Sequence, residues 1–186
     1  MKHHLKKFLQ LGLLLPLGAS MASVSAADAI NLNYIEGRIF NDFEITGSYQ
    51  INSDWFTFAS YLNKDHGIED YNNLEFGGGL LVRGLMDHDL ITTASLVRRS
   101  VNNYNDTGIS VSVGVRDFFF QDYLNDVDVL QPIELRGAFI IEEVGDFDTY
   151  IELGADYHFT PNFSAGLQLD LGGYEDTISL GARWFY

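Results

Sequence analysis

Alternation of apolar and polar residues is the feature that most restricts how this chain can fold. In the last ten residues, one set of alternate positions holds Ile178, Leu180, Ala182, Trp184 and Tyr186, and the other holds Thr177, Ser179, Gly181 and Arg183. A strand that alternates in this way has one apolar face and one polar or small face. Aromatic rings at the end of such a strand suit the headgroup level of a membrane. The segment therefore predicts an amphipathic strand that ends at a membrane interface.

The same period-two pattern recurs through nearly all of the chain after residue 26, and no helical period is sustained. We predict ten strands, over residues 30–39, 43–51, 55–63, 73–84, 89–99, 108–119, 132–142, 147–159, 163–171 and 176–186. Compact turns, at residues 52–54, 86–88 and 160–162 and at 125–128 within a longer connection, alternate with more polar connections at 41–42, 64–71, 100–107, 143–146 and 172–175. This asymmetry is typical of an outer-membrane barrel with short periplasmic turns.

The predicted fold class is therefore all-β, a closed antiparallel up-and-down transmembrane β-barrel. Ten strands are preferred, and eight remain an alternative if the hairpin around residues 41–42 lies outside the membrane. Several strands also share a glycine followed by an aromatic or apolar end, as in residues 47–51, 114–118, 154–159 and 181–186. Such a repeat also occurs in propellers and solenoids. The aromatic strand ends and the signal peptide expected over the first 26 residues favour the membrane barrel.

The first 26 residues are expected to form a cleaved signal peptide, followed by a barrel domain over residues 27–186. Three lysines precede an apolar run over residues 8–17, and small residues come before Ala27. The remaining chain holds 26 acidic and 8 basic residues, because three of the eleven lysines and arginines lie in the expected signal. Such an acidic chain is unsuited to binding nucleic acid through phosphates. The chain has no cysteine, so no disulfide framework is expected.

The polar faces of the predicted strands carry charges of both signs, which are expected to face the barrel interior. The predicted lumen charge network consists of Glu75, Arg83, Arg116, Glu134, Arg136, Glu142, Glu152, Asp156, Asp170 and Arg183. Buried ions need compensating partners, and the planar fork of arginine holds carboxylates well. Two interpretations stay open: a structural network that plugs the interior, or a gate or conduction path lined by these charges. A barrel of about eight strands is just filled by side chains, which favours the plug.

Two further groups are expected near the membrane surfaces. The predicted interface aromatics are Tyr49, Trp55, Tyr157, Phe159, Phe163, Trp184 and Tyr186. Arg98 and Arg99 are expected near the outer end of their strand. They are interpreted either as contacts for lipopolysaccharide phosphates or as simple charges on the barrel rim.

Catalytic and metal-binding patterns are absent from the sequence. His66, His88 and His158 are expected at an outer loop, a periplasmic turn and the lower lumen, so no two should meet. His66 is expected in an acidic loop. The acidic residues of this loop are explained more simply by contact with solvent than by a catalytic acid–histidine cluster. The chain has neither a Gly-x-Ser-x-Gly elbow nor a His-Glu-x-x-His zinc motif, and its acidic loops lack calcium-loop spacing. We therefore expect a protein that is not an enzyme and that uses no cofactor or metal.

The expected signal, the glycine-aromatic strands and the final Gly181-Ala182-Arg183-Trp184-Phe185-Tyr186 resemble small outer-membrane β-barrel proteins of Gram-negative bacteria, the OmpA-like or porin-like domains. The resemblance implies an outer-membrane location, contact with lipid and lipopolysaccharide, and recognition of the last strand by the barrel assembly machinery. It points to no specific protein partner. The expected function is a structural or surface-interaction barrel with a largely plugged lumen. A narrow porin-like channel is the alternative, and a lipid-modifying enzyme is a remote one.

Overall fold

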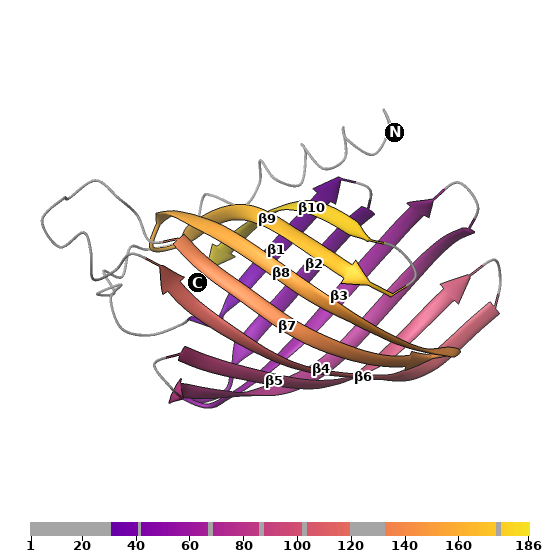
Figure 1. The fold of residues 1–186 in the computed structure, drawn as a ribbon, viewed down its shortest axis with the longest axis horizontal. Helices are drawn as coiled ribbons and strands as arrows, with labels where there is room; N and C mark the ends of the chain where they lie inside the picture. Colours follow the sequence, from indigo (N-terminus) through magenta and orange to yellow (C-terminus); the bar gives the residue numbers. More distant parts are fainter. Residues whose placement is uncertain are drawn as a thin grey trace, which may run out of the picture. The chain divides into compact units, whose positions relative to one another are not determined.

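Ten antiparallel strands wind into a closed barrel in the computed structural model, which describes residues 31–40, 42–66, 69–85, 88–101, 104–119, 133–173 and 176–186 (Figure 1). The strands are β1 (Tyr34–Phe40), β2 (Asp42–Gln50), β3 (Trp55–His66), β4 (Glu69–Leu85), β5 (His88–Val101), β6 (Tyr104–Phe119), β7 (Ile133–Val144), β8 (Asp146–Thr160), β9 (Phe163–Gly172) and β10 (Thr177–Phe185). Each strand pairs with its neighbours in the chain, and β1 pairs with β10. The predicted all-β, ten-stranded up-and-down barrel is therefore confirmed.

The first and last strands close the barrel in a continuous antiparallel register. The pairing runs from Tyr34 opposite Phe185 to Phe40 opposite Ser179. We call the end where β1 begins and β10 ends the terminal end, and the opposite one the distal end. The predicted signal peptide and the turn at residues 125–128 lie outside the described residues. No helix in the described part of the chain is long and apolar enough to cross a membrane.

Two strand pairs, β3 with β4 and β5 with β6, extend well beyond their predicted distal ends. Residues 64–71 and 100–107 were expected to be loops, but β3 and β4 remain paired as far as His66 opposite Glu69, and β5 and β6 as far as Val101 opposite Tyr104. Backbone pairing continues there although the side chains are polar, so apolar alternation gives no signal of it. Residues 143–146 likewise form only a tight turn, in which Gly145 adopts a φ of 78° that favours glycine.

The two faces of the barrel wall differ sharply in polarity. The exposed outward positions are mostly large apolar residues, among them Ile35, Ile45, Phe76, Leu96, Val111, Val113, Phe139, Ile151, Leu153, Leu167 and Leu180. Where the structure describes the side chains at outward-alternating positions, the acidic and basic residues are Arg98, Asp117 and Glu143, and each lies near a strand end. Inward positions hold most of the buried charged and polar residues.

The third strand has aromatic residues on both of its faces, so alternation alone does not decide which face points inward. Trp55 is 54% exposed, whereas Phe56 is 6% exposed and belongs to the interior. Phe58 packs beside it as a partly buried side chain. The interior of β3 is therefore aromatic at its terminal end, and Trp55 faces outward.

Candidate functional site in the barrel lumen

Six charged side chains from five strands meet inside the terminal half of the barrel, and we call them the ion cluster. They are Glu36 on β1, Arg116 on β6, Glu134 and Arg136 on β7, Asp156 on β8 and Arg183 on β10. The three carboxylates and three guanidinium groups balance in formal charge. Arg183 and Glu134 are 1% and 0% exposed, so their charges are shielded from water. Such burial is tolerable only because each ion has partners of opposite sign.

Arg183 lies at the centre of the ion cluster. Its Nη2 donates to Glu36 Oε2 at 3.0 Å, and its Nη1 donates to Glu134 Oε1 at 3.1 Å. Arg116 Nη2 donates to the other oxygen of Glu134 at 2.7 Å. Arg136 Nε lies 3.0 Å from Asp156 Oδ2. One carboxylate from the first strand and one from the seventh therefore share one arginine, which ties β10 to β1 and β7.

Aromatic rings cover the ion cluster on its terminal side. The Arg183 guanidinium lies 4.7 Å from the ring centroid of Tyr34 and 5.7 Å from that of Phe185. His158 Nε2 lies 2.9 Å from Glu134 Oε2, and its ring stacks on Phe185 at 5.5 Å. These rings exclude water from the guanidinium, which strengthens its interaction with the carboxylates.

A second group of buried side chains fills the rest of the terminal end. Leu32, Phe56 and Leu81 form a hydrophobic cluster, and the partly buried side chains packed against it are Tyr34, Phe58, Ile91 and Phe118. We call this group the apolar plug. The plug and the ion cluster both lie in the terminal half of the lumen, and Tyr34 contacts both groups.

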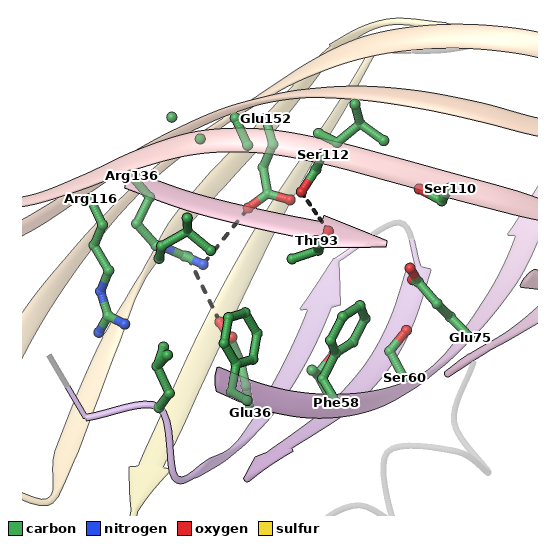
Figure 2. A pocket seen from close by; sticks show the side chains of 18 of the residues that line it. Glu36, Phe58, Ser60, Glu75, Thr93, Ser110, Ser112, Arg116, Arg136 and Glu152 are labelled. Carbon is green, nitrogen blue, oxygen red and sulfur yellow. Dashed lines mark hydrogen bonds and ion pairs between the residues drawn. The ribbon is translucent and has the colours of Figure 1, made fainter. Parts of the chain in front are cut away.

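The lumen also holds two adjoining cavities, one next to these groups and one nearer the distal end. The inner cavity, of about 220 Å³, lies between Phe58 and Glu75 on one wall and Arg116 and Arg136 on the other (Figure 2). The distal cavity, of about 210 Å³, continues towards the strand ends. Both are lined by Arg38, Glu44, Ser60, Glu75, Tyr150 and Glu152. We call the distal cavity the vestibule and these six shared residues the waist.

The vestibule is strongly acidic. Its carboxylates are Asp42, Glu44, Glu75, Glu142, Asp148, Glu152 and Asp170, and its cationic side chains are Arg38, Lys64 and Arg99. Arg99 pairs with Glu142, Lys64 lies 3.8 Å from Asp42, and Arg38 lies 3.6 Å from Glu44. Among the described residues, seven carboxylates thus face three cations, in contrast to the balanced ion cluster of the terminal half.

The residues of the predicted lumen network lie in three places: the ion cluster, the vestibule and, for one arginine, the exposed end of β4. Arg116, Glu134, Arg136, Asp156 and Arg183 belong to the ion cluster, and Glu152 reaches its edge through Arg136 at 3.7 Å. The network also contains Glu75, Glu142 and Asp170, which line the vestibule. Arg83 is instead exposed near the terminal end of β4. The register shifts between Val82 and Leu85, and Gly84 there has a φ of 65°, so regular inward alternation is lost.

Arg98 and Arg99 face opposite sides of the wall, which corrects the expectation that both lie on the outer rim. Arg98 is exposed, whereas Arg99 binds Glu142 and donates from Nε to Asn73 Oδ1 at 3.1 Å. The Arg99 guanidinium also lies 5.3 Å from the ring centroid of Tyr71. Adjacent residues of a strand point to opposite faces, so only one of the two arginines can reach an external ligand.

The predicted interface aromatics include several exposed rings. Tyr49, Trp55, Phe159, Trp184 and Tyr186 are exposed, whereas Tyr157 and Phe163 are half-buried. Phe159 has its ring centroid 4.9 Å from that of Tyr157 and 5.9 Å from that of Phe163. These three rings form one aromatic group at the β8–β9 turn of the terminal end.

Sequence reasoning missed Glu36, Arg38 and Tyr34, although they alternate with Ile35 and Ile39 on the first predicted strand. The alternation of Ile35, Gly37 and Ile39 with Glu36 and Arg38 was the available signal. The three residues supply part of the ion cluster, its aromatic cover and the waist.

The described histidines lie apart from one another. His158 is in the lumen, whereas His88 Nδ1 lies 2.8 Å from Asp117 Oδ2, and both side chains of that pair are largely exposed. The side chain of His66 lies outside the described residues. Within the described ranges, no group of three or more histidine, aspartate and glutamate side chains is arranged to hold a metal.

Comparison with protein-family models finds no match, and a search of curated proteins finds no significantly similar sequence. The candidate site is therefore interpreted from its own geometry.

Proposed function

We propose that this protein is a bacterial outer-membrane barrel with a plugged lumen and a structural or surface-interaction role. The observation that carries the proposal is the reversed polarity of the molecule. Balanced ions are buried inside, and large apolar side chains are exposed around the outside. A water-soluble protein would expose such a continuous apolar surface at a high cost, whereas lipid covers it favourably.

The height of the apolar exterior supports this proposal. Phe147 and Phe159 are both exposed on β8, and Ile151 and Leu153 lie between them. Twelve residue steps of about 3.3 Å, tilted by about 40°, span about 30 Å along the barrel axis. The apolar band of outer-membrane barrels is about 25 Å tall, so these two rings suit its two edges.

The same proposal includes the partners inferred from the sequence. Residues 1–26 would direct export, and the aromatic-ended β10 would be recognised by the barrel assembly machinery. Membrane lipid would cover the apolar exterior, and exposed Arg98 is the better placed of the two rim arginines to reach lipopolysaccharide phosphates. No catalytic activity is part of the proposal.

Cell fractionation is the direct test of this location. We expect the protein in the outer-membrane fraction, with a faster gel mobility before heating than after it. Recovery in the soluble periplasmic fraction, with no change of mobility on heating, would contradict the proposal. A variant without residues 1–26 is the matched control, because it should stay in the cytoplasm and fail to show the folded mobility.

A narrow channel is the second candidate, and the joined cavities favour it. The inner cavity and the vestibule share the waist, so the ion cluster and the apolar plug are the obstructions that separate these cavities from the terminal end. Planar-bilayer recording of folded protein distinguishes the two candidates. Regular conductance steps would support a channel, and their absence in a sample that shows the folded mobility would support the plugged barrel.

A further inference from the structure

We propose that the vestibule binds a small linear diamine or polyamine. This inference goes beyond a plugged structural barrel, because it assigns a ligand class to the distal half of the lumen. The ion cluster of the terminal half is electrically balanced, whereas the distal cavity of about 210 Å³ has an excess of carboxylates among its described lining residues. An enclosed pocket with an excess of one sign concentrates ligands of the opposite sign.

Three vestibule carboxylates have no ion pair among the described residues. Glu75 accepts a hydrogen bond from the hydroxyl of Ser95. Asp170 accepts from Gln168 Nε2 at 2.9 Å and from Thr177 Oγ1 at 3.0 Å. Asp148 accepts from the backbone N–H of Thr149 at 2.8 Å. Neutral donors satisfy part of their hydrogen-bonding capacity and leave their negative charges uncompensated.

Gln168 gives an independent indication that a donor belongs in this space. Its side chain lines the vestibule and is only 5% exposed. Its Nε2 binds Asp170, but its Oε1 is buried and has no hydrogen-bond partner among the described residues. A buried amide oxygen without a donor is unfavourable, and an ammonium group supplies three N–H donors.

The arrangement suits several separated charges better than a compact metal ion. The described carboxylates do not gather into a group that could hold a metal. They are distributed from Glu75 and Glu152 at the waist to Asp148 and Asp170 nearer the strand ends. Tyr150 at the waist lies among Glu75, Glu142, Glu152 and Asp170, where its ring offers an aromatic face to an ammonium group.

A linear diamine matches these features in its chemistry, because it has two separated ammonium groups joined by a thin apolar chain. One ammonium group would bind at the waist, next to Tyr150 and Glu75. The other would reach Asp170 and the free oxygen of Gln168. The methylene chain between them would lie in the cavity, whose volume is below the roughly 300–1,000 Å³ of drug-sized sites and therefore selects a thin ligand.

The test is calorimetric titration of the complete barrel domain, residues 27–186, folded in detergent. The titrants are 1,4-diaminobutane and spermidine. We expect saturable binding of both amines that is at least tenfold tighter than binding of butylamine, which has one charge. The variant Glu75→Gln/Asp170→Asn should weaken diamine binding at least tenfold. Gln168→Met keeps the net charge but removes both the oxygen acceptor and the Nε2 donor to Asp170, and it should weaken binding about threefold to tenfold.

The matched control is Glu143→Gln/Asp146→Asn, which removes two charges from the exposed β7–β8 turn of the same distal end. It should bind diamines as the parent does. Equal losses in the vestibule and control variants would reduce the effect to general charge attraction and overturn the proposal. Butylamine binding as tightly as the diamine would also overturn it. All variants are first checked for the folded gel mobility, and a variant that fails to fold is replaced by the corresponding single substitution.

The titration is independent of where the protein resides in the cell. Failure of diamine binding would leave the outer-membrane proposal intact, and recovery of the protein in the soluble fraction would leave the binding result intact.

Discussion

Replacing Arg183 with methionine should destabilise the barrel by about 3–5 kcal/mol, the range typical of breaking a buried ion pair from one side. Arg183 is 1% exposed and holds Glu36 and Glu134 at 3.0 and 3.1 Å. Methionine fills much of the same volume but leaves three carboxylates of the ion cluster facing two arginines. The loss should stay within this range rather than exceed it, because Glu36 keeps Arg38 and Glu134 keeps Arg116.

Urea unfolding of the folded protein in lipid vesicles measures this loss. Gel mobility and far-ultraviolet circular dichroism are suitable probes, because Trp184 adjoins the substitution and would change its fluorescence for local reasons. Arg98→Met is the matched control, since it removes an exposed arginine, and it should change the free energy of unfolding by less than about 0.5 kcal/mol.

A double-mutant cycle separates charge imbalance from lost packing. Arg183→Met combined with Glu36→Gln restores equal numbers of positive and negative charges in the ion cluster. The double variant should therefore lose less than the sum of the single losses, by about 1–3 kcal/mol. Additive losses, or a loss below about 1 kcal/mol for Arg183→Met alone, would refute the view that a balanced buried network holds β10 to β1 and β7.

Three further predictions concern the exterior, a close backbone contact and the plug. In lipid vesicles, Leu153→Arg should cost about 2–4 kcal/mol and Tyr104→Arg about 0–1 kcal/mol, since the first lies within the apolar band and the second near the distal strand ends. Equal costs would argue against lipid contact. In urea titrations, Gly108→Ala should cost about 1–3 kcal/mol because its Cβ would overlap a β7 carbonyl, whereas Gly47→Ala has open space and should be nearly neutral. Phe56→Ala should produce conductance steps in planar bilayers if the apolar plug seals the terminal end, and a silent variant would assign the seal to the ion cluster alone.

The fold was predictable because alternation is a local property of each strand. In β9, Ser164, Gly166, Gln168 and Asp170 alternate with outward apolar residues whatever the rest of the chain does, and ten such segments with alternating connections specify the barrel. Strand ends were less predictable. Residues 64–71 and 100–107 are polar on both faces, so nothing in their hydropathy separates a paired strand from a loop, although their backbone pairing continues.

The lumen was only partly predictable because its interior is mixed rather than uniformly polar. Phe56, Leu81 and Val97 face inward and are buried, so an apolar residue does not always mark the outer face. The meeting of Glu36 with Arg183 depends on which strands close the barrel and in which register, a property of all ten strands together. Two consecutive arginines, Arg98 and Arg99, gave no local indication of which one faces inward.

The uneven distribution of charge explains why the two halves of the lumen differ in what they can do. A charge-balanced cluster can be buried under aromatic rings, because each ion finds its partners within the protein. The surplus carboxylates of the vestibule cannot be buried in the same way, since an unpaired buried ion is far too costly. They require a proton, water or a cationic ligand, and the cavities at the waist and vestibule supply room for water and for a ligand. The charge-balanced terminal half therefore contributes stability, and the acidic distal half is the part of the lumen that is suited to binding a cation.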